Sequence, residues 1–188
     1  SFGWKHDYPV TLDGKMFLAD IAFGGAFYAI VNAEDLGLNL VVNDLPLLQI
    51  WGKRIIHFIE SNLDVRHPSE KDLQGLSGVI FSGRPQKPDS HSRNVTIFAN
   101  GQIGRSPCGT GTSAKMASLY QRGQLAVNQA FVHESITGSR FTGRIMELSK
   151  VGSDTAVITH IKGRAFITGI HQFFVDPCDP LQHGFVLR

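Results

Sequence analysis

The segment RSPCGTGTSAKMA, residues 105–117, places Cys108 directly before alternating glycines and threonines. The residues after it predict a helix from about residue 112 to 122. A helix N-terminus exposes backbone N–H groups that have no partner and carries partial positive charge. Gly109 and Gly111 leave the backbone uncovered, so an anion can approach it closely. We therefore expect a cradle for an anion such as a carboxylate, with Cys108 at its edge.

This arrangement suits the removal of a proton next to a carboxylate. A thiol at the positive end of a helix favours the reactive thiolate, which can act as a general base. The cradle can hold the carboxylate and stabilise the charge that develops on it as the proton leaves.

The residues alone also allow two other interpretations. One is a buried structural cysteine before an ordinary glycine-rich helix start. The other is a thiol hydrolase in which a distant histidine activates the cysteine. The candidates for that role are His57, His67, His133 and His171, and no spacing distinguishes any of them.

Spacing and charge argue against several other kinds of site. The segment lacks the spacing of a phosphate-binding P-loop, because Lys115 is in the wrong position. No spacing typical of a metal site occurs, and we expect no metal. The net charge is +2 and no basic stripe is present, so we expect no nucleic-acid partner. No apolar run approaches the roughly 18–20 residues of a membrane helix, so we expect no membrane association.

The chain of 188 residues is long enough for one domain or one large lobe with a hydrophobic core. Hydrophobic residues make up 42% and charged residues 18%, which indicates a folded chain. The two cysteines, Cys108 and Cys178, do not suggest a disulfide framework, and we expect a reducing, cytoplasmic location. The first residue is Ser1 and not methionine, which is consistent with a piece of a longer protein.

Apolar patterning predicts more strands than helices. Strands are expected at residues 16–23, 27–32, 77–82, 94–99, 131–136, 141–147, 155–161 and 165–175. A further helix is expected at about 44–62, with Asp44 as its N-cap and Pro46 in its first turn. A polar loop at residues 84–94 is expected to be mobile, or else functional. The mixed order predicts an α+β fold and not regular βαβ winding.

Four blocks of the sequence resemble the proline racemase family, which includes hydroxyproline epimerases and trans-3-hydroxy-L-proline dehydratases. They occur in the family's order and are DIAFGGAFYAIV (20–31), RSPCGTGTSAKMA (105–117), FVHESITGSRFTGRI (131–145) and DPCDPLQHGFVL (176–187). The resemblance implies a barrel-like mixed sheet around a central helix, like one lobe of diaminopimelate epimerase. It also implies that residues 1–188 form a single lobe, similar to the C-terminal half of a family member, and that the N-terminal lobe is absent.

The resemblance implies a reaction that needs no cofactor and uses two bases. One thiolate removes the α-proton of a cyclic imino acid, and a second thiol returns a proton to the opposite face. By this likeness Cys108 is one of the two thiols, and the backbone N–H groups of Gly109 and Thr110 hold the substrate carboxylate. Phe98 matches an aromatic wall against the pyrrolidine ring, with a core strand residue as the alternative. The expected partners are proline or hydroxyproline and the missing N-terminal lobe, and a homodimer is one expected assembly.

Three features depart from the family pattern. The MCGH-like motif that carries the family's other catalytic position does not occur, so the chain carries half of a site, and Cys178 is not expected to replace the missing thiol. Gly104 stands where racemases and epimerases usually carry an aspartate that receives the ring nitrogen of the substrate. Ala26 replaces an asparagine, which resembles the dehydratase branch, whereas dehydratases of the animal type carry threonine at the position of Cys108.

The first hypothesis is therefore a racemase or epimerase of proline or hydroxyproline, and the second is a trans-3-hydroxy-L-proline dehydratase. Both begin with removal of the α-proton, after which reprotonation competes with loss of a 3-hydroxyl group. A third hypothesis, of another class, is a non-catalytic domain that binds a carboxylate ligand or a partner lobe. We expect the 188-residue chain alone to be inactive, because inversion needs a base on each face.

Overall fold

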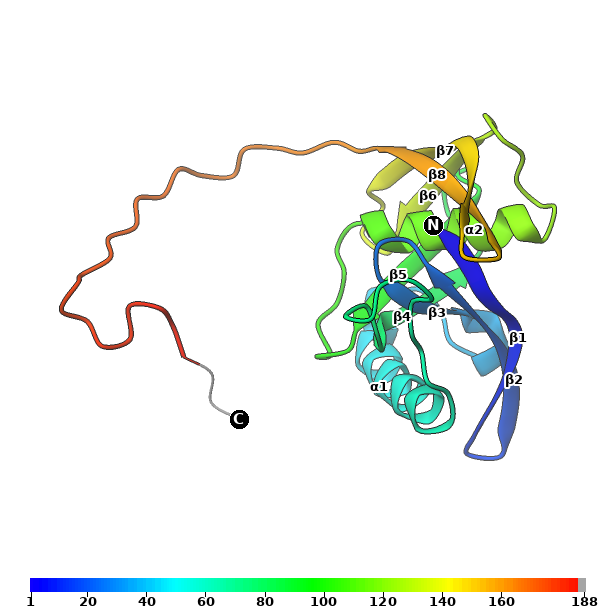
Figure 1. Ribbon diagram of the computed structural model, residues 1–188, viewed down its shortest axis with the longest axis horizontal. Helices are drawn as coiled ribbons and strands as arrows, with labels where there is room; N and C mark the ends of the chain where they lie inside the picture. The colour runs from blue at the N-terminus through cyan, green and yellow to red at the C-terminus, as the bar shows by residue number, and fades with distance from the viewer. Residues whose placement is uncertain (186–188) are drawn as a thin grey trace.

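The computed structural model describes residues 1–185. Their eight strands form one mixed sheet (Figure 1). The strands are β1 (Phe2–Leu12), β2 (Lys15–Phe23), β3 (Phe27–Asn32), β4 (Leu76–Gly83), β5 (Ser92–Phe98), β6 (Ala130–Ser135), β7 (Arg140–Val151) and β8 (Asp154–Lys162). They are hydrogen-bonded to one another in chain order. Within the described residues, the pairs β3–β4 and β5–β6 are parallel and the others are antiparallel.

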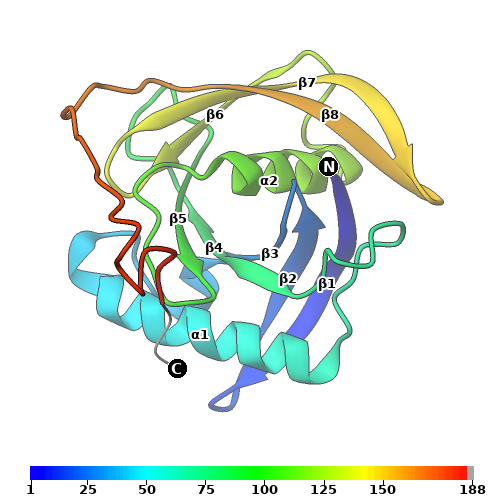
Figure 2. The ribbon, with the colours of Figure 1, turned by 60° about the vertical axis from the view of Figure 1, so that its left-hand side comes forward.

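Each parallel pair needs a long crossover connection, and each crossover carries a helix. Helix α1 (Leu45–Asn62) joins β3 to β4 after two short 3-10 helices, η1 (Ala33–Leu36) and η2 (Val42–Asp44). Helix α2 (Gly109–Gln121) joins β5 to β6. The sheet curves around α2, whereas α1 covers its outer face (Figure 2). The predicted α+β fold, with a mixed sheet around a central helix, is thereby confirmed.

The curved sheet comes close to a barrel without closing into one. Its two edge strands approach each other where Ser1, just before β1, lies beside Val157 in β8. The backbone N–H of Val157 donates to the Ser1 carbonyl at 2.7 Å, and the Ser1 amino group donates back at 2.9 Å. This contact holds the sheet around α2 on the side where the ladder is open.

Small side chains allow the sheet to surround α2. Ala114, Ala117 and Ser118 are buried, together with Met116. A Cβ atom at Gly143 in β7 would lie 2.4 Å from the Met116 sulfur, so the glycine leaves the space that this side chain fills. Because α2 is buried on most sides, its buried residues are not confined to one face. The helix therefore has no clear division into an apolar and a polar face.

The helix predicted at residues 44–62 is confirmed as α1. Its buried side faces the sheet and consists of Leu48, Trp51, Gly52, Ile55, Ile56 and Ile59. Asp44 stands at the N-cap as predicted, but its carboxylate accepts hydrogen bonds from Asn39 and none from the helix N–H groups. Pro46 lies in the first turn, where its missing N–H leaves no bond unmade.

Three predictions about the elements were incomplete or wrong. Helix α2 begins at Gly109 and not at residue 112. Strand β1 was not predicted, because two register shifts and the left-handed backbone of Asp7 (φ 53°) interrupt its apolar alternation. The strand predicted at 165–175 is wrong: within the described residues, the segment 163–176 forms no helix or strand. A strand needs a neighbour to satisfy its backbone groups, and the described residues supply none there.

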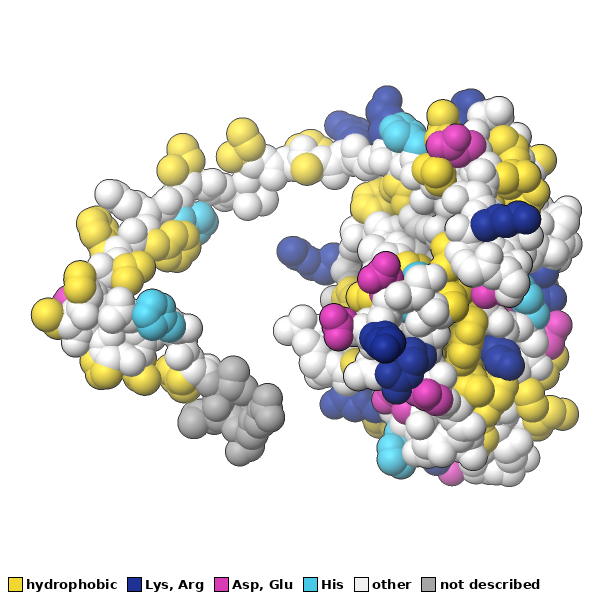
Figure 3. Space-filling model, in the orientation of Figure 1, with side chains coloured by type: hydrophobic (Ala, Val, Ile, Leu, Met, Phe, Trp, Pro, Cys, Tyr) yellow, Lys and Arg dark blue, Asp and Glu magenta, His cyan; other side chains and the backbone are white. Residues whose placement is uncertain are grey.

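Residues 163–185 form an extended segment, here called the C-terminal arm, that leaves the body after β8 (Figure 1). Apolar side chains stand exposed along it (Figure 3), namely Phe166, Ile167, Ile170, Phe173, Phe174 and Val175. Exposed apolar stretches of this kind mark interaction surfaces. Val186 and Leu187, the last residues of the block 176–187, lie outside the described residues.

The loop at residues 84–94, which was predicted to be mobile, is hydrogen-bonded to β6. The backbone N–H groups of Gln86 and Lys87 donate to the Glu134 carboxylate at 3.1 and 3.0 Å, and the His91 N–H donates to the Val132 carbonyl at 2.8 Å. Its mobility stays a prediction. No helix within residues 1–185 has the length and hydropathy that spanning a membrane requires.

Asp20 joins β2 to the C-terminal part of α2. Its carboxylate accepts hydrogen bonds from Ser118 Oγ at 2.6 Å, from Arg122 at 2.6 and 2.9 Å, and from the Asp7 N–H at 3.1 Å. Burial raises the pKa of Asp20, but the hydrogen bonds from Arg122, Ser118 and the Asp7 backbone outweigh it and hold the pKa at about 2. The ionised carboxylate is therefore the form that the fold stabilises.

Replacing Asp20 should alter the acid stability of the fold. Because its folded pKa of about 2 lies below the unfolded value, its contribution is present above about pH 4 and is lost as the pH falls towards 2. We expect Asp20→Asn to lower the free energy of unfolding at pH 7 by about 1–2 kcal/mol, after allowance for solvent screening, and to flatten the pH dependence between about pH 4 and 2. Urea unfolding at a series of pH values measures both effects.

The matched control is Asp64→Asn, which removes a carboxylate that lies exposed beside Arg66. This variant should keep the pH dependence of the parent chain. An Asp20→Asn variant with the same acid transition as the parent would contradict the stabilising role of the Asp20 contacts.

Candidate active site

Cys108 sits at the N-cap of α2 in a strained backbone conformation, with φ 65° and ψ 122°. A residue other than glycine adopts a positive φ at a cost of about 1–3 kcal/mol, and only where the surrounding structure enforces it. This conformation turns the side chain back onto the helix, so that Sγ accepts a hydrogen bond from the Gly111 N–H at 3.3 Å. The thiol thus takes the capping position that hydroxyl and carboxylate side chains commonly hold.

Two backbone N–H groups beside the thiol have no acceptor among the described residues. The first bond of the helix runs from the Thr112 N–H to the Cys108 carbonyl at 2.8 Å, and the Gly111 N–H is taken by Sγ. The N–H groups of Gly109 and Thr110, both exposed residues, are left over. They lie where the sequence predicted an anion cradle, next to Cys108, and their binding of an anion stays a prediction.

Glycines allow the sulfur and a neighbouring turn to approach this first helical turn. A Cβ at Gly111 would lie 3.1 Å from the Cys108 sulfur and 2.9 Å from Ile80. A Cβ at Gly24, in the β2–β3 turn, would lie 2.1 Å from the Thr110 carbonyl. The Gly-Gly turn of the block 20–31 therefore packs directly against the helix N-terminus.

Tyr28 in β3 is a contact of Cys108 that the sequence pattern did not single out. Its hydroxyl lies 2.8 Å from Thr110 Oγ1 and 3.6 Å from Cys108 Sγ. Burial raises the pKa of Tyr28 to about 12, and the neighbouring Cys108 adds to the rise. The phenol therefore stays neutral at physiological pH and can donate a hydrogen bond to an anion. In the sequence, the position of Tyr28 shortly after the Gly-Gly turn was the only feature that could have pointed to this contact.

Phe98 and Gly104 lie side by side near the thiol. Phe98 ends β5 and packs, partly buried, against the apolar cluster that includes Cys108 and Tyr28. A Cβ at Gly104 would lie 3.6 Å from the Phe98 ring and 3.4 Å from Thr96, which is ordinary contact distance. An aspartate side chain could therefore begin at this position without displacing its neighbours.

The histidines considered for a thiol hydrolase do not pair with Cys108. Among the described residues, the polar contacts of its sulfur are Gly111, Tyr28 and Thr110. His57 lies on α1, His171 in the C-terminal arm, and His67 packs against Phe2 and Phe23. His133 is buried in β6, where its ring contacts Thr112.

Cys178 and the acidic residues were also considered in relation to the site. Cys178 lies exposed in the C-terminal arm, in a turn where its N–H donates to Asp176. Residues 1–185 hold no cluster of three or more histidine, cysteine or acidic side chains arranged for a metal ion. A cleft of about 660 Å³ lies further along α2, lined in part by Lys115, Ser118 and Arg122, and Cys108 does not line it.

Comparison with known proteins places the whole chain in one group. The family described as "Proline racemase" matches residues 1–186. A trans-3-hydroxy-L-proline dehydratase of Bacillus thuringiensis subsp. konkukian is 50% identical over 187 residues, which cover 100% of this chain and 56% of that protein. A proline racemase of Acetoanaerobium sticklandii is 43% identical over 173 residues, which cover 92% of this chain and 52% of that protein.

A solved structure has the same fold. The crystal structure of a hydroxyproline epimerase from Agrobacterium vitis, with bound trans-4-hydroxy-L-proline, superposes with a TM-score of 0.88 at 36% identity and covers 99% of this chain and 53% of that one. The chain spans about half the length of the relatives that it matches. With the family match over residues 1–186 and the close relatives along the same residues, the chain belongs to the proline racemase family.

Proposed function

We propose that the chain provides half of an active site that removes the α-proton of proline or a hydroxyproline, with Cys108 as one of two acid/base thiols. One observation carries this proposal. In a chain of this family, the Cys108 sulfur lies at the N-terminus of the central helix, beside the N–H groups of Gly109 and Thr110, which have no acceptor among the described residues.

These groups can divide the reaction between them. The N–H groups of Gly109 and Thr110 hold the substrate carboxylate, which places the α-carbon next to the sulfur. The Cys108 thiolate takes the α-proton, and the negative charge that develops spreads into the carboxylate, where the helix N-terminus stabilises it. The neutral Tyr28 hydroxyl, 3.6 Å from the sulfur, can donate a hydrogen bond to the thiolate before the transfer. Phe98 provides an apolar wall for the ring of the substrate.

The second half of the site belongs, in this proposal, to an N-terminal lobe that is not part of these 188 residues. Residues 1–188 correspond to the C-terminal lobe. The relatives are about twice as long as the matched region, which leaves room for such a lobe. The exposed apolar side chains of the C-terminal arm are the surface that it would cover. Its base would lie on the face of the substrate opposite Cys108.

The step after proton removal divides the proposal into two candidates. Reprotonation on the opposite face gives a racemase or epimerase. Loss of the 3-hydroxyl group gives a trans-3-hydroxy-L-proline dehydratase, and two observations favour this second candidate. The relative with 50% identity is such a dehydratase, and Gly104 offers no carboxylate for the ring nitrogen of the substrate.

A substrate panel tests the proposal in the complete protein. L-proline, trans-4-hydroxy-L-proline and trans-3-hydroxy-L-proline are incubated separately, with optical rotation and the formation of a pyrroline product as readouts. Inversion without loss of water supports the racemase or epimerase, and loss of water from the 3-hydroxy substrate supports the dehydratase. We expect Cys108→Ser to lower kcat by about 10²–10⁴-fold or more, because a hydroxyl is a poor base at neutral pH. Substantial activity of this variant would remove Cys108 from the acid/base role.

We expect the 188-residue chain by itself to be inactive, because inversion needs a base on each face of the substrate and the proposal places only Cys108 in this chain. Incubation with L-proline and 4-hydroxyproline in heavy water, followed by mass spectrometry, measures the deuterium at the α-carbon. The complete protein serves as the positive control. Deuterium incorporation by the isolated chain would show that this lobe removes the α-proton by itself and is not inert.

Iodoacetamide should label Cys108 faster than Cys178 in the folded chain. Exposure alone predicts the reverse order, because Cys108 is 9% exposed whereas Cys178 lies open in the C-terminal arm. A faster reaction at Cys108 would therefore report activation by the helix N-terminus. Mass spectrometry of the two cysteine peptides gives the rates. In urea the difference should disappear, and faster labelling of Cys178 in the folded chain would contradict the activation.

A further inference from the structure

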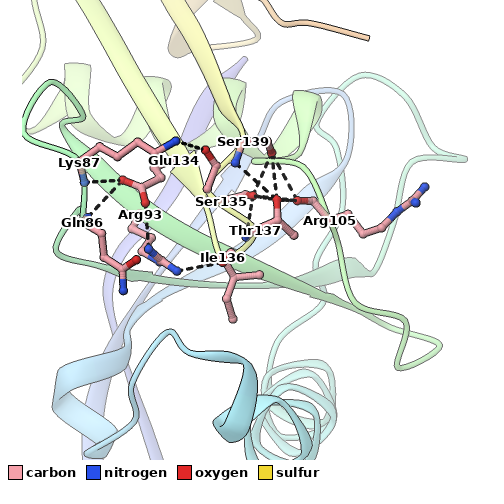
Figure 4. Close-up of polar contacts among 10 residues, drawn as sticks. Gln86, Lys87, Arg93, Arg105, Glu134, Ser135, Ile136, Thr137 and Ser139 are labelled. Carbon is pink, nitrogen blue, oxygen red and sulfur yellow. Dashed lines mark hydrogen bonds and ion pairs between the residues drawn. The ribbon is translucent and has the colours of Figure 1, made fainter. Parts of the chain in front are cut away.

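The loop that leads into Cys108 is held by side chains from other elements. Figure 4 shows the Arg105 carbonyl accepting hydrogen bonds from Ser135 Oγ at 2.7 Å and from Thr137 Oγ1 at 2.9 Å. Two residues further, the Pro107 carbonyl accepts from Asn94 Nδ2 at 2.9 Å and from Thr112 Oγ1 at 3.1 Å. Both carbonyls precede the strained Cys108 and limit how its backbone can relax.

The direction of the bond between Thr112 and His133 is set by its neighbours. A hydroxyl carries one proton, and the Pro107 carbonyl can only accept, so the Thr112 hydroxyl donates to Pro107. The same oxygen lies 3.0 Å from His133 Nδ1 and must accept there. The ring therefore carries a proton on Nδ1, which makes His133 the donor.

The ring holds this form stably. His133 is fully buried, and Nε2 has no partner among the described residues. Burial, with a smaller contribution from the positive charge of Lys115, lowers the pKa of His133 to about 3. A neutral ring has a single N–H, and its only polar contact among the described residues is Thr112. The tautomer is consequently the one that orients the Thr112 hydroxyl towards Pro107.

We infer that His133 is a positioning residue for Cys108: its Nδ1–H orients the Thr112 hydroxyl, which holds the Pro107 carbonyl and so the backbone that presents the thiol at the helix N-terminus. This inference rests on the proposed role of Cys108. It also explains two parts of the block 131–145, since His133 acts on Pro107 while Ser135 and Thr137 hold Arg105. No direct contact between His133 and the substrate is involved.

Two matched pairs of variants in the complete protein test the inference. Thr112→Val removes the hydroxyl at nearly constant shape, and Thr112→Ser keeps it. His133→Asn keeps an N–H donor at the δ position, whereas His133→Gln moves it to the ε position. We expect Thr112→Val and His133→Gln to lower kcat by about a hundredfold with a smaller change in KM, because the thiol is displaced from the α-carbon. Thr112→Ser and His133→Asn should recover most of that loss.

Labelling of Cys108 by iodoacetamide provides a second readout that needs no substrate. It should slow in Thr112→Val and His133→Gln and recover in the paired variants, while urea unfolding reports the stability of each. Equal rates within each pair, or rates that track only the free energy of unfolding, would overturn the inference. If the histidine variants do not fold, the threonine pair decides the question.

The two readouts separate the inference from the proposed function. If the parent protein converts none of the three imino acids but the labelling rates still divide the variants as expected, the positioning role stands and the proposed substrate class fails. If the parent converts an imino acid and both variants of each pair behave alike, the proposed function stands and the positioning role fails.

Discussion

The candidate site depends on the close approach of the sheet to the first turn of α2. A helix can be enclosed by a sheet only where side chains are small, and glycines mark the points of closest contact. Gly24 lies where a Cβ would overlap the Thr110 carbonyl, and Gly143 leaves the space for Met116. Because packing fixes α2 from several sides, the Gly109 and Thr110 N–H groups at its start, which have no acceptor within residues 1–185, have a fixed position. Such preorganised dipoles can stabilise a developing charge without rearrangement.

The same packing sustains an unfavourable backbone conformation at Cys108, the residue proposed as the acid/base group. Cys108 adopts a left-handed φ that most side chains avoid, and side-chain donors hold both neighbouring carbonyls, three at Arg105 and two at Pro107. Strain of this kind persists only where the surroundings determine it fully. The gain is a thiol that folds back onto the helix N-terminus, within reach of both a backbone N–H and the Tyr28 hydroxyl.

The exposed C-terminal arm and the proposed role of Cys108 both fit the proposal of a second lobe. The arm exposes a series of apolar side chains that a folded chain ordinarily buries, and in the proposed function Cys108 supplies the base on only one face of the substrate. The chain spans about half the length of its relatives in the proline racemase family. A second lobe would resolve both features, by covering the arm and by placing a second base opposite Cys108.

The sequence by itself determined the local features. Apolar periodicity indicated α1 and most strands, and the glycine and hydroxyl pattern around Cys108 indicated a helix start with an anion cradle. These depend on residues close together in the chain. The periodicity could not reveal β1, whose bulges disturb the alternation, and it produced a false strand at 165–175, where apolar residues have no neighbour to pair with among the described residues.

Only the tertiary structure decided which distant residues meet the thiol. Tyr28 approaches from β3, and Asn94 and His133 support the loop from β5 and β6. Tertiary contacts also decide that the helix starts at Gly109, since contacts to those strands hold the left-handed turn at Cys108. Hydrogen bonds between segments separated by 80 residues, such as the contact of Cys108 with Tyr28, depend on how the strands are ordered in the sheet. Local spacing carries no information about which strands become neighbours, because contacts between distant segments decide that.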